Sequence, residues 1–353
     1  MDRRSGDALR LTATFAVLAI HCAGVFESRL VVGGAGGWQA VFAATMSQFA
    51  RFSVPVFMVL SGYGLTASRI HRGEGGLAGN LAMWRRQFLR IGLPFLLFTL
   101  IGLTFRGRFG ADDPLSWPIT LGNALVKGRG DYHLYFLTFL LQSYIFLPLL
   151  MRCSWGVVAG LLLLQLYLGR PGAEACAEIG LWRPSLEAYW CPHWLGYVAL
   201  GCRLARRDSE KPLTGAGRWP WAIAALACGG WCLADFLTRV AKVPDAGWAN
   251  HFFRASVMAY SVTLLMAWRA WGAHMASQRG EKSPKPGALL AKLTALSFLV
   301  YLGHTWVLRG LAATPIGKLY PLLVIALVVG AFGAAWILDR TVKWKWPRII
   351  LGL

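Results

Sequence analysis

An arginine and a histidine in the first apolar segment have the types and spacing best suited to chemistry. Residues 8–26 read ALRLTATFAVLAIHCAGVF, with Arg10 near the basic end and His21 well inside. In a helix, eleven residues correspond to about three turns and about 16 Å, so both side chains lie on one face. An ionisable residue inside a membrane span is a candidate functional residue, and an imidazole can take up a proton or an acyl group. A packed, hydrogen-bonded structural histidine is the alternative.

Two further arginines fall inside apolar segments. Arg51 precedes FSVPVFMVLSGYGL, in which we expect Pro55 to interrupt the helix, and Arg254 lies in a later segment. A guanidinium at membrane depth needs a carboxylate, a cavity or a ligand phosphate. The small pair Ser61 and Gly62 allows another helix or a thin ligand to approach closely, so this segment is either a kinked packing helix or part of a channel.

Three arginines gather at the start of the next segment, WRRQFLRIGLP. Arg85, Arg86 and Arg90 are spaced by one helical turn or less. Such a cluster marks the cytoplasmic end of a span, or it forms a clamp for the phosphates of a cofactor that arrives from the cytoplasm, because guanidinium groups match phosphate oxygens.

Polar residues also mark two segment ends that we place near the outer face. Asp131, Tyr132 and His133 open one segment, where they either line an entrance for an acceptor substrate or form a hydrated helix end. Tyr301 and His304 lie on adjacent turns of one helix face in another segment.

These residues must be positioned by membrane helices. Of 353 residues, 56% are hydrophobic and 15% are charged, and the mean hydropathy of +0.49 is that of a chain that lives in a bilayer. We therefore predict an all-α, polytopic helix bundle with about ten transmembrane helices, forming a single integral-membrane domain over residues 1–353. The ten apolar segments are 8–27, 38–65, 87–105, 132–151, 154–169, 190–205, 219–238, 251–271, 288–309 and 319–339.

The distribution of positive charge predicts the orientation. The net charge is +20, but the basic residues lie between apolar segments and form no single patch interleaved with aromatics, so we expect no nucleic-acid partner. The two ends and the even-numbered loops carry 23 Lys and Arg, against 11 in the odd-numbered loops, which predicts cytoplasmic termini. The seven cysteines lack the spacing of a metal site, although Cys176 and Cys191 share an outer loop that permits a disulfide.

The ordered motifs resemble those of the acyltransferase family 3 membrane proteins. Arg10 and His21 fit the R-x10-H pattern of that family, and the similarity covers essentially the whole chain. The other matching pieces, in the same order, are FSVPVFMVLSGYGL from Phe52, RRQFLRIGLP from Arg85, HLYFL from His133 and YLGHTWVL from Tyr301. The resemblance implies a ten-helix bundle that acylates surface polysaccharides. A glycine precedes His304 where an aliphatic residue is common in the family.

The resemblance also implies roles for individual residues. His21 would be the catalytic base or acyl-relay residue, with Arg10 as its companion. The residues expected along the CoA channel are Arg85, Arg86, Arg90, Ser61 and Tyr301. No hydrolase-like domain follows the membrane part before Leu353, so we expect acceptor transfer to be completed by the bundle or by a separate partner.

The predicted function is O-acyl transfer in a multi-pass cell membrane protein, in the inner membrane if the source is Gram-negative. The donor is acyl-CoA, with acetyl-CoA the commonest in the family, and no cofactor or metal is permanently bound. The acceptor is a sugar hydroxyl of an exopolysaccharide, another surface polysaccharide or a lipid-linked precursor, with membrane lipid and polysaccharide-synthesis proteins as further partners. The alternatives are a transporter or flippase whose path is lined by the intramembrane Arg and His residues, or an accessory subunit of an export complex. Release of CoA from acetyl-CoA would distinguish the enzyme from both.

Overall fold

The structure, a computed structural model, is helical throughout the residues it describes, with no β-strand among them. These are residues 1–33, 37–107, 116–168, 191–211, 215, 217–242, 252–279 and 287–353; the side chains of 27–33 and 241–242 are not described. Cys176 of the expected disulfide lies outside the described residues. The chain divides into two compact units, each built from two stretches of sequence: Met1–Leu60 with Arg207–Ala335, and Ser61–Arg206 with Trp336–Leu353.

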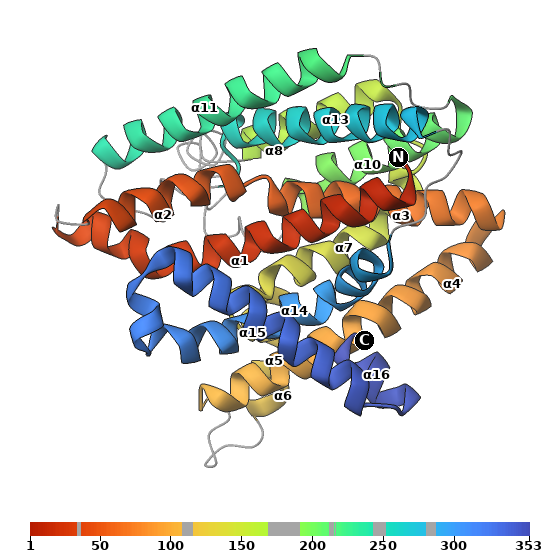
Figure 1. Ribbon diagram of the computed structural model, residues 1–353. Helices are drawn as coiled ribbons and strands as arrows, with labels where there is room; N and C mark the ends of the chain where they lie inside the picture. Colours follow the sequence, from red (N-terminus) through yellow and green to blue (C-terminus); the bar gives the residue numbers. More distant parts are fainter. Residues whose placement is uncertain are drawn as a thin grey trace, which may run out of the picture. The chain divides into compact units, whose positions relative to one another are not determined.

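The first unit contains the helix that carries Arg10 and His21. Helix α1 (Arg3–Gly33) packs against α2 (Gly37–Ala50) and α14 (Ala288–Ala312), as Figure 1 shows. Helix α11 (Arg218–Lys242) packs along α13 (Ala255–Gln278) and also contacts α2. The start of α3 (Ser53–Arg72) and most of α15 (Tyr320–Thr341) complete this unit, with the 3₁₀ turn Pro315–Lys318 between α14 and α15.

The second unit begins within α3 and contains the arginine cluster. Helix α4 (Gly76–Gln87) continues through a π-helical segment (Phe88–Gly92) into α5 (Leu93–Phe105). Helices α6 (Trp117–Lys127) and α7 (Tyr135–Leu150) follow, and α6 contacts both α5 and α7. The remaining elements are α8 (Trp155–Leu168), the 3₁₀ turn Cys191–His193, most of α10 (Leu195–Glu210) and α16 (Lys345–Leu351).

Within the described residues, a helix occupies most of each predicted apolar segment. Among the described residues, six stretches are long and apolar enough to cross a membrane: Arg3–Phe26, Gly37–Arg72, Gly76–Phe105, Arg218–Val240, Ala288–Ala312 and Tyr320–Thr341. Helices α7 and α8 are apolar but shorter, and α10 and α13 occupy the other two predicted segments. The all-helical, membrane-type fold is therefore confirmed, while the total of ten crossings and the cytoplasmic termini stay predictions.

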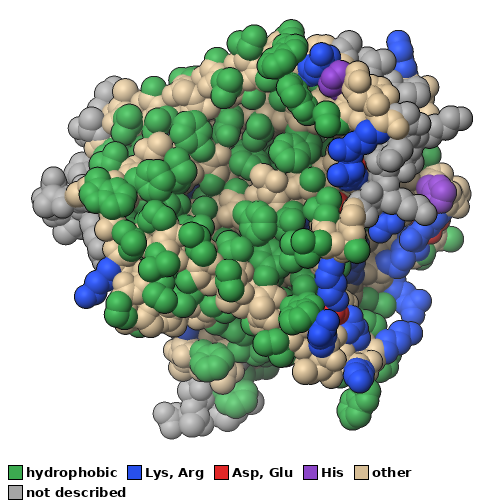
Figure 2. Space-filling view, in the orientation of Figure 1, with side chains coloured by type: hydrophobic (Ala, Val, Ile, Leu, Met, Phe, Trp, Pro, Cys, Tyr) green, Lys and Arg blue, Asp and Glu red, His purple; other side chains and the backbone are tan. Residues whose placement is uncertain are grey.

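The exposed side chains suit a lipid environment. Hydrophobic side chains cover most of the visible face in Figure 2, and Lys and Arg are nearly absent from its middle. On α11, for example, the side chains of Ile223 and Leu226 are exposed. Large exposed apolar surfaces are rare on soluble monomers, so this surface is explained by contact with lipid.

The predicted kink at Pro55 is wrong in its position. The helical segment breaks one turn earlier, at Arg51 and Phe52, between α2 and α3. Pro55 lies in the first turn of α3, where a missing N–H costs no helical hydrogen bond and the fixed φ of proline favours the helix. Proline therefore starts the second helix of this pair and does not bend a continuous one.

Candidate active site

Two histidines from separate apolar helices meet inside the first unit. His21 of α1 and His304 of α14 have ring centroids 4.9 Å apart, with the ring planes inclined by 44°. The His304 side chain is 0% exposed, and His21 is partly buried. Because α1 packs directly on α14, the contact places two titratable groups together in an otherwise apolar layer.

A hydrogen bond fixes the tautomer of the neutral His304 side chain. Its Nδ1 lies 2.7 Å from the backbone carbonyl oxygen of Tyr301. A carbonyl oxygen only accepts, so Nδ1 carries the proton and donates, and in the neutral ring Nε2 carries the lone pair. The ring of Tyr301 lies 5.9 Å from that of His304 between centroids. Tyr301, predicted as a site residue, is therefore next to the histidine pair.

Arg10 lies on the same continuous helix as His21, as the spacing predicted. The rise of about 16 Å between the two residues keeps the guanidinium from direct contact with the imidazole. Thr14 donates a hydrogen bond to the Arg10 carbonyl oxygen at 3.0 Å, one turn along α1. The partly buried Arg10 side chain therefore lies near the N-terminal end of this helix, about three turns from the histidine pair.

The arginine cluster belongs to the second unit, and its members have different environments. Arg86 forms an ion pair with Glu74, with Nη2 and Oε2 2.5 Å apart, and this hydrogen bond lowers the pKa of Glu74 below its ordinary value. Arg85 and Arg90 are exposed. Two of the three predicted phosphate-binding guanidinium groups are thus open to a ligand, while Arg86 is engaged within the chain.

A π-helical segment at Phe88–Gly92 carries Arg90 and was not predicted. The amide of Leu93 bonds to the carbonyl of Phe88, five residues back. Pro94 follows directly and has no N–H to donate to the Arg90 carbonyl, so the regular ladder cannot continue through this turn. Short π segments are frequent at functional sites, and the Gly92-Leu-Pro94 sequence is the signal that could have indicated this one.

Ser61 and Gly62 serve close helix packing in the second unit. The hydroxyl groups of Ser61 and Tyr144 are 2.5 Å apart. A Cβ atom on Gly62 would lie 2.2 Å from the carbonyl oxygen of Val198, so α10 approaches the backbone of α3 at this point. The predicted close approach of another helix is confirmed, while a ligand-binding role for Ser61 stays a prediction.

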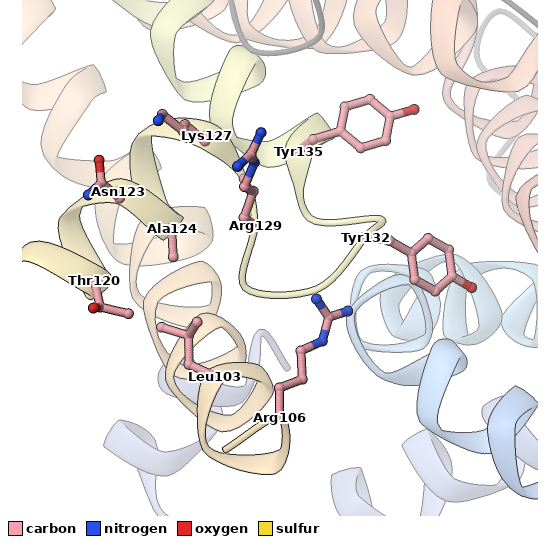
Figure 3. Close-up of a pocket in the computed structure, with 10 residues that line it drawn as sticks. Leu103, Arg106, Thr120, Asn123, Ala124, Lys127, Arg129, Tyr132 and Tyr135 are labelled. Carbon is pink, nitrogen blue, oxygen red and sulfur yellow. The ribbon is translucent and has the colours of Figure 1, made fainter. Parts of the chain in front are cut away.

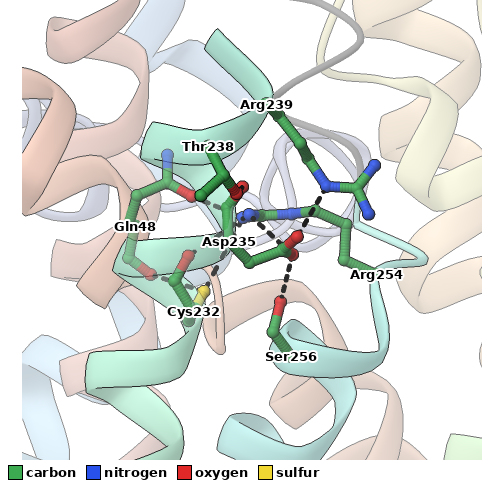
Figure 4. A network of polar contacts seen from close by, with 7 residues as sticks. All are labelled: Gln48, Cys232, Asp235, Thr238, Arg239, Arg254 and Ser256. Atoms are coloured by element: carbon green, nitrogen blue, oxygen red, sulfur yellow. Dashed lines mark hydrogen bonds and ion pairs between the residues drawn. The ribbon is translucent and has the colours of Figure 1, made fainter. Parts of the chain in front are cut away.

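Arg254 has the buried partners that its position required (Figure 4). Its side chain is 4% exposed, and Nη1 lies 3.3 Å from Oδ2 of Asp235. Ser256 donates to the same oxygen at 2.6 Å, Arg239 donates to the other carboxylate oxygen at 2.7 Å, and Gln48 accepts from Arg254 Nη2. The network joins α2, α11 and the start of α13, which indicates a structural role.

Arg51 is also held by groups of the first unit. Its Nη2 donates to the hydroxyl of Ser47 at 3.2 Å, and its Cζ lies 4.9 Å from the ring centroid of Phe252, a distance typical of a cation–π contact. Both arginines that supported a substrate path are therefore in contact with other side chains of this unit.

Comparison with known protein families identifies the class of protein to which this chain belongs. A family model described as an acyltransferase domain matches residues 4–340, almost the whole chain. The chain belongs to acyltransferase family 3. No curated protein and no solved structure matches it. Together with its apolar helices of membrane length, the family makes this chain a membrane acyltransferase.

The pairing of His304 with His21 is the feature of this acyltransferase that sequence reasoning missed. Both histidines were identified as polar residues in apolar segments, but His304 was given no role in acyl transfer. The available signal was the polarity itself, because polar side chains within membrane helices tend to find one another. The sequence did not indicate which helix would supply the partner of His21, because that depends on how the helices pack.

Proposed function

We propose that this acyltransferase moves an acyl group, most simply acetyl, from acyl-CoA to a sugar hydroxyl of a surface polysaccharide or its lipid-linked precursor. The observation that carries the proposal is the contact of His21 with His304 inside a bundle of apolar helices. A pair of imidazoles, one buried and one partly buried, in a family of acyltransferases is suited to proton or acyl transfer, since the ring is available as a base near neutral pH.

Two chemical routes use His21. In the first, His21 takes the proton of the acceptor hydroxyl as its oxygen attacks the thioester carbonyl, the C–S bond breaks and CoA leaves as the thiolate, which is then protonated. In the second, an imidazole nitrogen attacks the thioester carbonyl, the C–S bond breaks and CoA leaves as the thiolate. The acceptor oxygen then attacks the acyl-imidazole, the C–N bond breaks to restore the neutral imidazole, and the hydroxyl proton ends on the CoA thiolate. Both routes give one ester and one CoA thiol per turnover.

His304 acts in this proposal as a positioning residue. Its Nδ1–H is fixed on the Tyr301 carbonyl, and its ring contacts that of His21. A ring that is held on one side cannot turn freely, so it limits the orientations open to His21. This is the general arrangement in which a base is oriented by a further group.

The donor is proposed to bind at the exposed guanidinium groups of Arg85 and Arg90. The CoA phosphates are anionic and cannot cross a bilayer, whereas the pantetheine arm is thin and can enter a helix bundle. Arginine forks form strong charge-assisted hydrogen bonds with phosphate oxygens. Arg10, one turn from the start of the apolar part of α1, is proposed to align the donor on its way to His21.

The test is acyl transfer by the purified protein in lipid nanodiscs. We expect His21→Ala to lower the release of CoA thiol from acetyl-CoA by about 10²- to 10⁴-fold, the usual contribution of a catalytic acid or base. His71→Ala, which removes an exposed histidine at the end of α3, is the matched control and should keep the wild-type rate. Mass spectrometry of cell-surface glycans with and without the protein identifies the acceptor.

A folded His21→Ala protein that releases CoA at the wild-type rate would refute the catalytic assignment. Uptake of a solute by proteoliposomes without any use of acyl-CoA would support the transporter alternative instead.

A further inference from the structure

A polar pocket opens in the second unit where the chain passes from α5 to α7 (Figure 3). Its volume is about 660 Å³, within the range of about 300–1,000 Å³ typical of small-molecule sites. The pocket is lined by the end of α5, one face of α6 and the loop before α7. The side chains that matter are Arg106, Asn123, Lys127, Arg129, Tyr132 and Tyr135.

Three basic side chains line the pocket, and one of them is paired with a carboxylate. The buried Asp131 carboxylate, 1% exposed, accepts hydrogen bonds from Arg106 at 2.5 Å and from the Tyr132 backbone N–H at 2.7 Å. One arginine is thereby fixed in place, and its extended side chain reaches the loop in Figure 3. Lys127 and Arg129 add two further positive charges to the lining. Such a set of donors is complementary to a carboxylate or phosphate.

The pocket also presents aromatic rings. Tyr132 is 47% exposed, and Tyr135 lines the same pocket. A tyrosine offers an apolar ring face together with a hydroxyl group, which suits the C–H face and the hydroxyl groups of a sugar. Asn123 adds an amide that can both donate and accept. The positive charges and the aromatic rings of the pocket are together complementary to a ligand that is both a saccharide and an anion.

The loop that carries Arg129 and Tyr132 is held tightly. Gly128 ends α6 with φ +61°, which a glycine adopts readily, and the Arg129 N–H returns to the Ala124 carbonyl at 2.8 Å. A Cβ atom on Gly102 of α5 would lie 2.3 Å from the Gly130 carbonyl oxygen, so the loop lies directly on the backbone of α5. A pocket fixed in this way loses little entropy when a ligand binds.

We propose that this pocket binds an anionic saccharide, a sugar that carries or adjoins an oxyacid group, as the acceptor of acyl transfer. The proposal rests on the proposed function and specifies its acceptor class. The distribution of Lys and Arg predicts that this loop faces away from the cytoplasm, where a surface polysaccharide is accessible. The anion can come from a uronate within the polymer or from the diphosphate of a lipid-linked sugar.

The experiment is a binding measurement on the full-length protein in detergent without acyl-CoA. The probes are tetragalacturonate, a neutral tetrasaccharide made by reducing its carboxyl groups, farnesyl diphosphate and CoA. We expect an anionic probe to bind to the wild type at least about tenfold more tightly than the neutral one, with an affinity that falls as salt is added. The double variant Lys127→Gln/Arg129→Gln should lose at least about tenfold in this affinity.

Two matched controls separate the pocket from general charge and folding effects. Arg309→Gln/Lys318→Gln removes two positive charges from another loop predicted on the same side and should bind as the wild type does. Tyr132→Ala should weaken binding of the saccharide probe, while Tyr132→Phe, which keeps the ring, should retain most of it.

Preference for tetragalacturonate supports the proposal with a uronate acceptor. Preference for farnesyl diphosphate over both tetrasaccharides overturns the saccharide requirement, because that probe carries a diphosphate but no sugar. Equal binding of the neutral tetrasaccharide, wild-type affinity in the Lys127 and Arg129 double variant, or displacement of the anionic probe by CoA overturns it. Failure of the proposed function is distinct: a protein that binds an anionic probe here but releases no CoA with any acceptor contradicts that function alone.

Discussion

A buried guanidinium is tolerated in an apolar helix bundle only if its partners match its charge and shape, and Arg254 meets this requirement. Its contacts with Asp235, Gln48 and the Cys232 carbonyl satisfy the side chain from two other helices. Removing one member leaves the others buried and incompletely paired, which costs more than the net value of the intact ion pair. The network therefore holds α13 to α11 and α2.

We accordingly predict that Arg254→Gln lowers the free energy of unfolding by about 3 kcal/mol. The control is Arg239→Gln, which removes the more exposed cation from the same carboxylate and should cost less than about 1 kcal/mol. Thermal unfolding of both variants in the same detergent measures the difference. If the two changes lower the melting temperature equally, burial is not what gives Arg254 its importance.

For individual residues, the sequence indicated which side chains are important, but it did not indicate what those side chains contact. His21 and His304 stand out as polar residues in apolar segments, and Arg51 and Arg254 as charges that need partners. The contact between the two histidines depends on the packing of α1 on α14, which no local pattern specifies. Of the two partners of Arg51, Ser47 is local in sequence, whereas the Phe252 ring is brought to it by packing.

At the scale of elements, apolar periodicity located the helices but not their interruptions. The break between α2 and α3, the π-helical segment and helix α6 all fall within or beside stretches that composition treats as uniform. Proline explains the first two in hindsight, because it starts α3 and removes a donor after the π segment. Helix α6 lies between the predicted segments 87–105 and 132–151, where no apolar helix was predicted.

Glycine in α3 offers a matched test of helix packing. We predict that Gly62→Ala destabilises the protein, because the added Cβ would lie 2.2 Å from the Val198 carbonyl oxygen and must push α10 away. Gly64→Ala, two residues along the same helix, meets nothing within 4 Å and should be neutral or more stable by up to about 1 kcal/mol. The melting temperatures of the two variants in detergent test this prediction. If Gly62→Ala does not lower the melting temperature, the two helices do not pack this closely.

For the whole molecule, the family and the helices of membrane length both indicate a membrane acyltransferase. The orientation of the chain in the membrane is predicted only from the Lys and Arg content of the loops. If the termini are cytoplasmic, the acyl donor and the proposed acceptor pocket face opposite sides of the bilayer, and the acyl group must pass through the bundle to its acceptor. Orientation is therefore the property on which the link between the histidine pair and a surface glycan depends.

Cysteine labelling in intact cells tests this orientation directly. Lys127 in α6 and Lys343 after α15 are both exposed positions. We predict that Lys127→Cys reacts with a membrane-impermeant maleimide added to intact cells, whereas Lys343→Cys reacts only after the cells are permeabilised, because the positive-inside distribution places the two on opposite sides. The unsubstituted protein gives the background from its own cysteines. Labelling in the reverse order would place the proposed acceptor pocket on the cytoplasmic side, where a surface polysaccharide could reach it only before export.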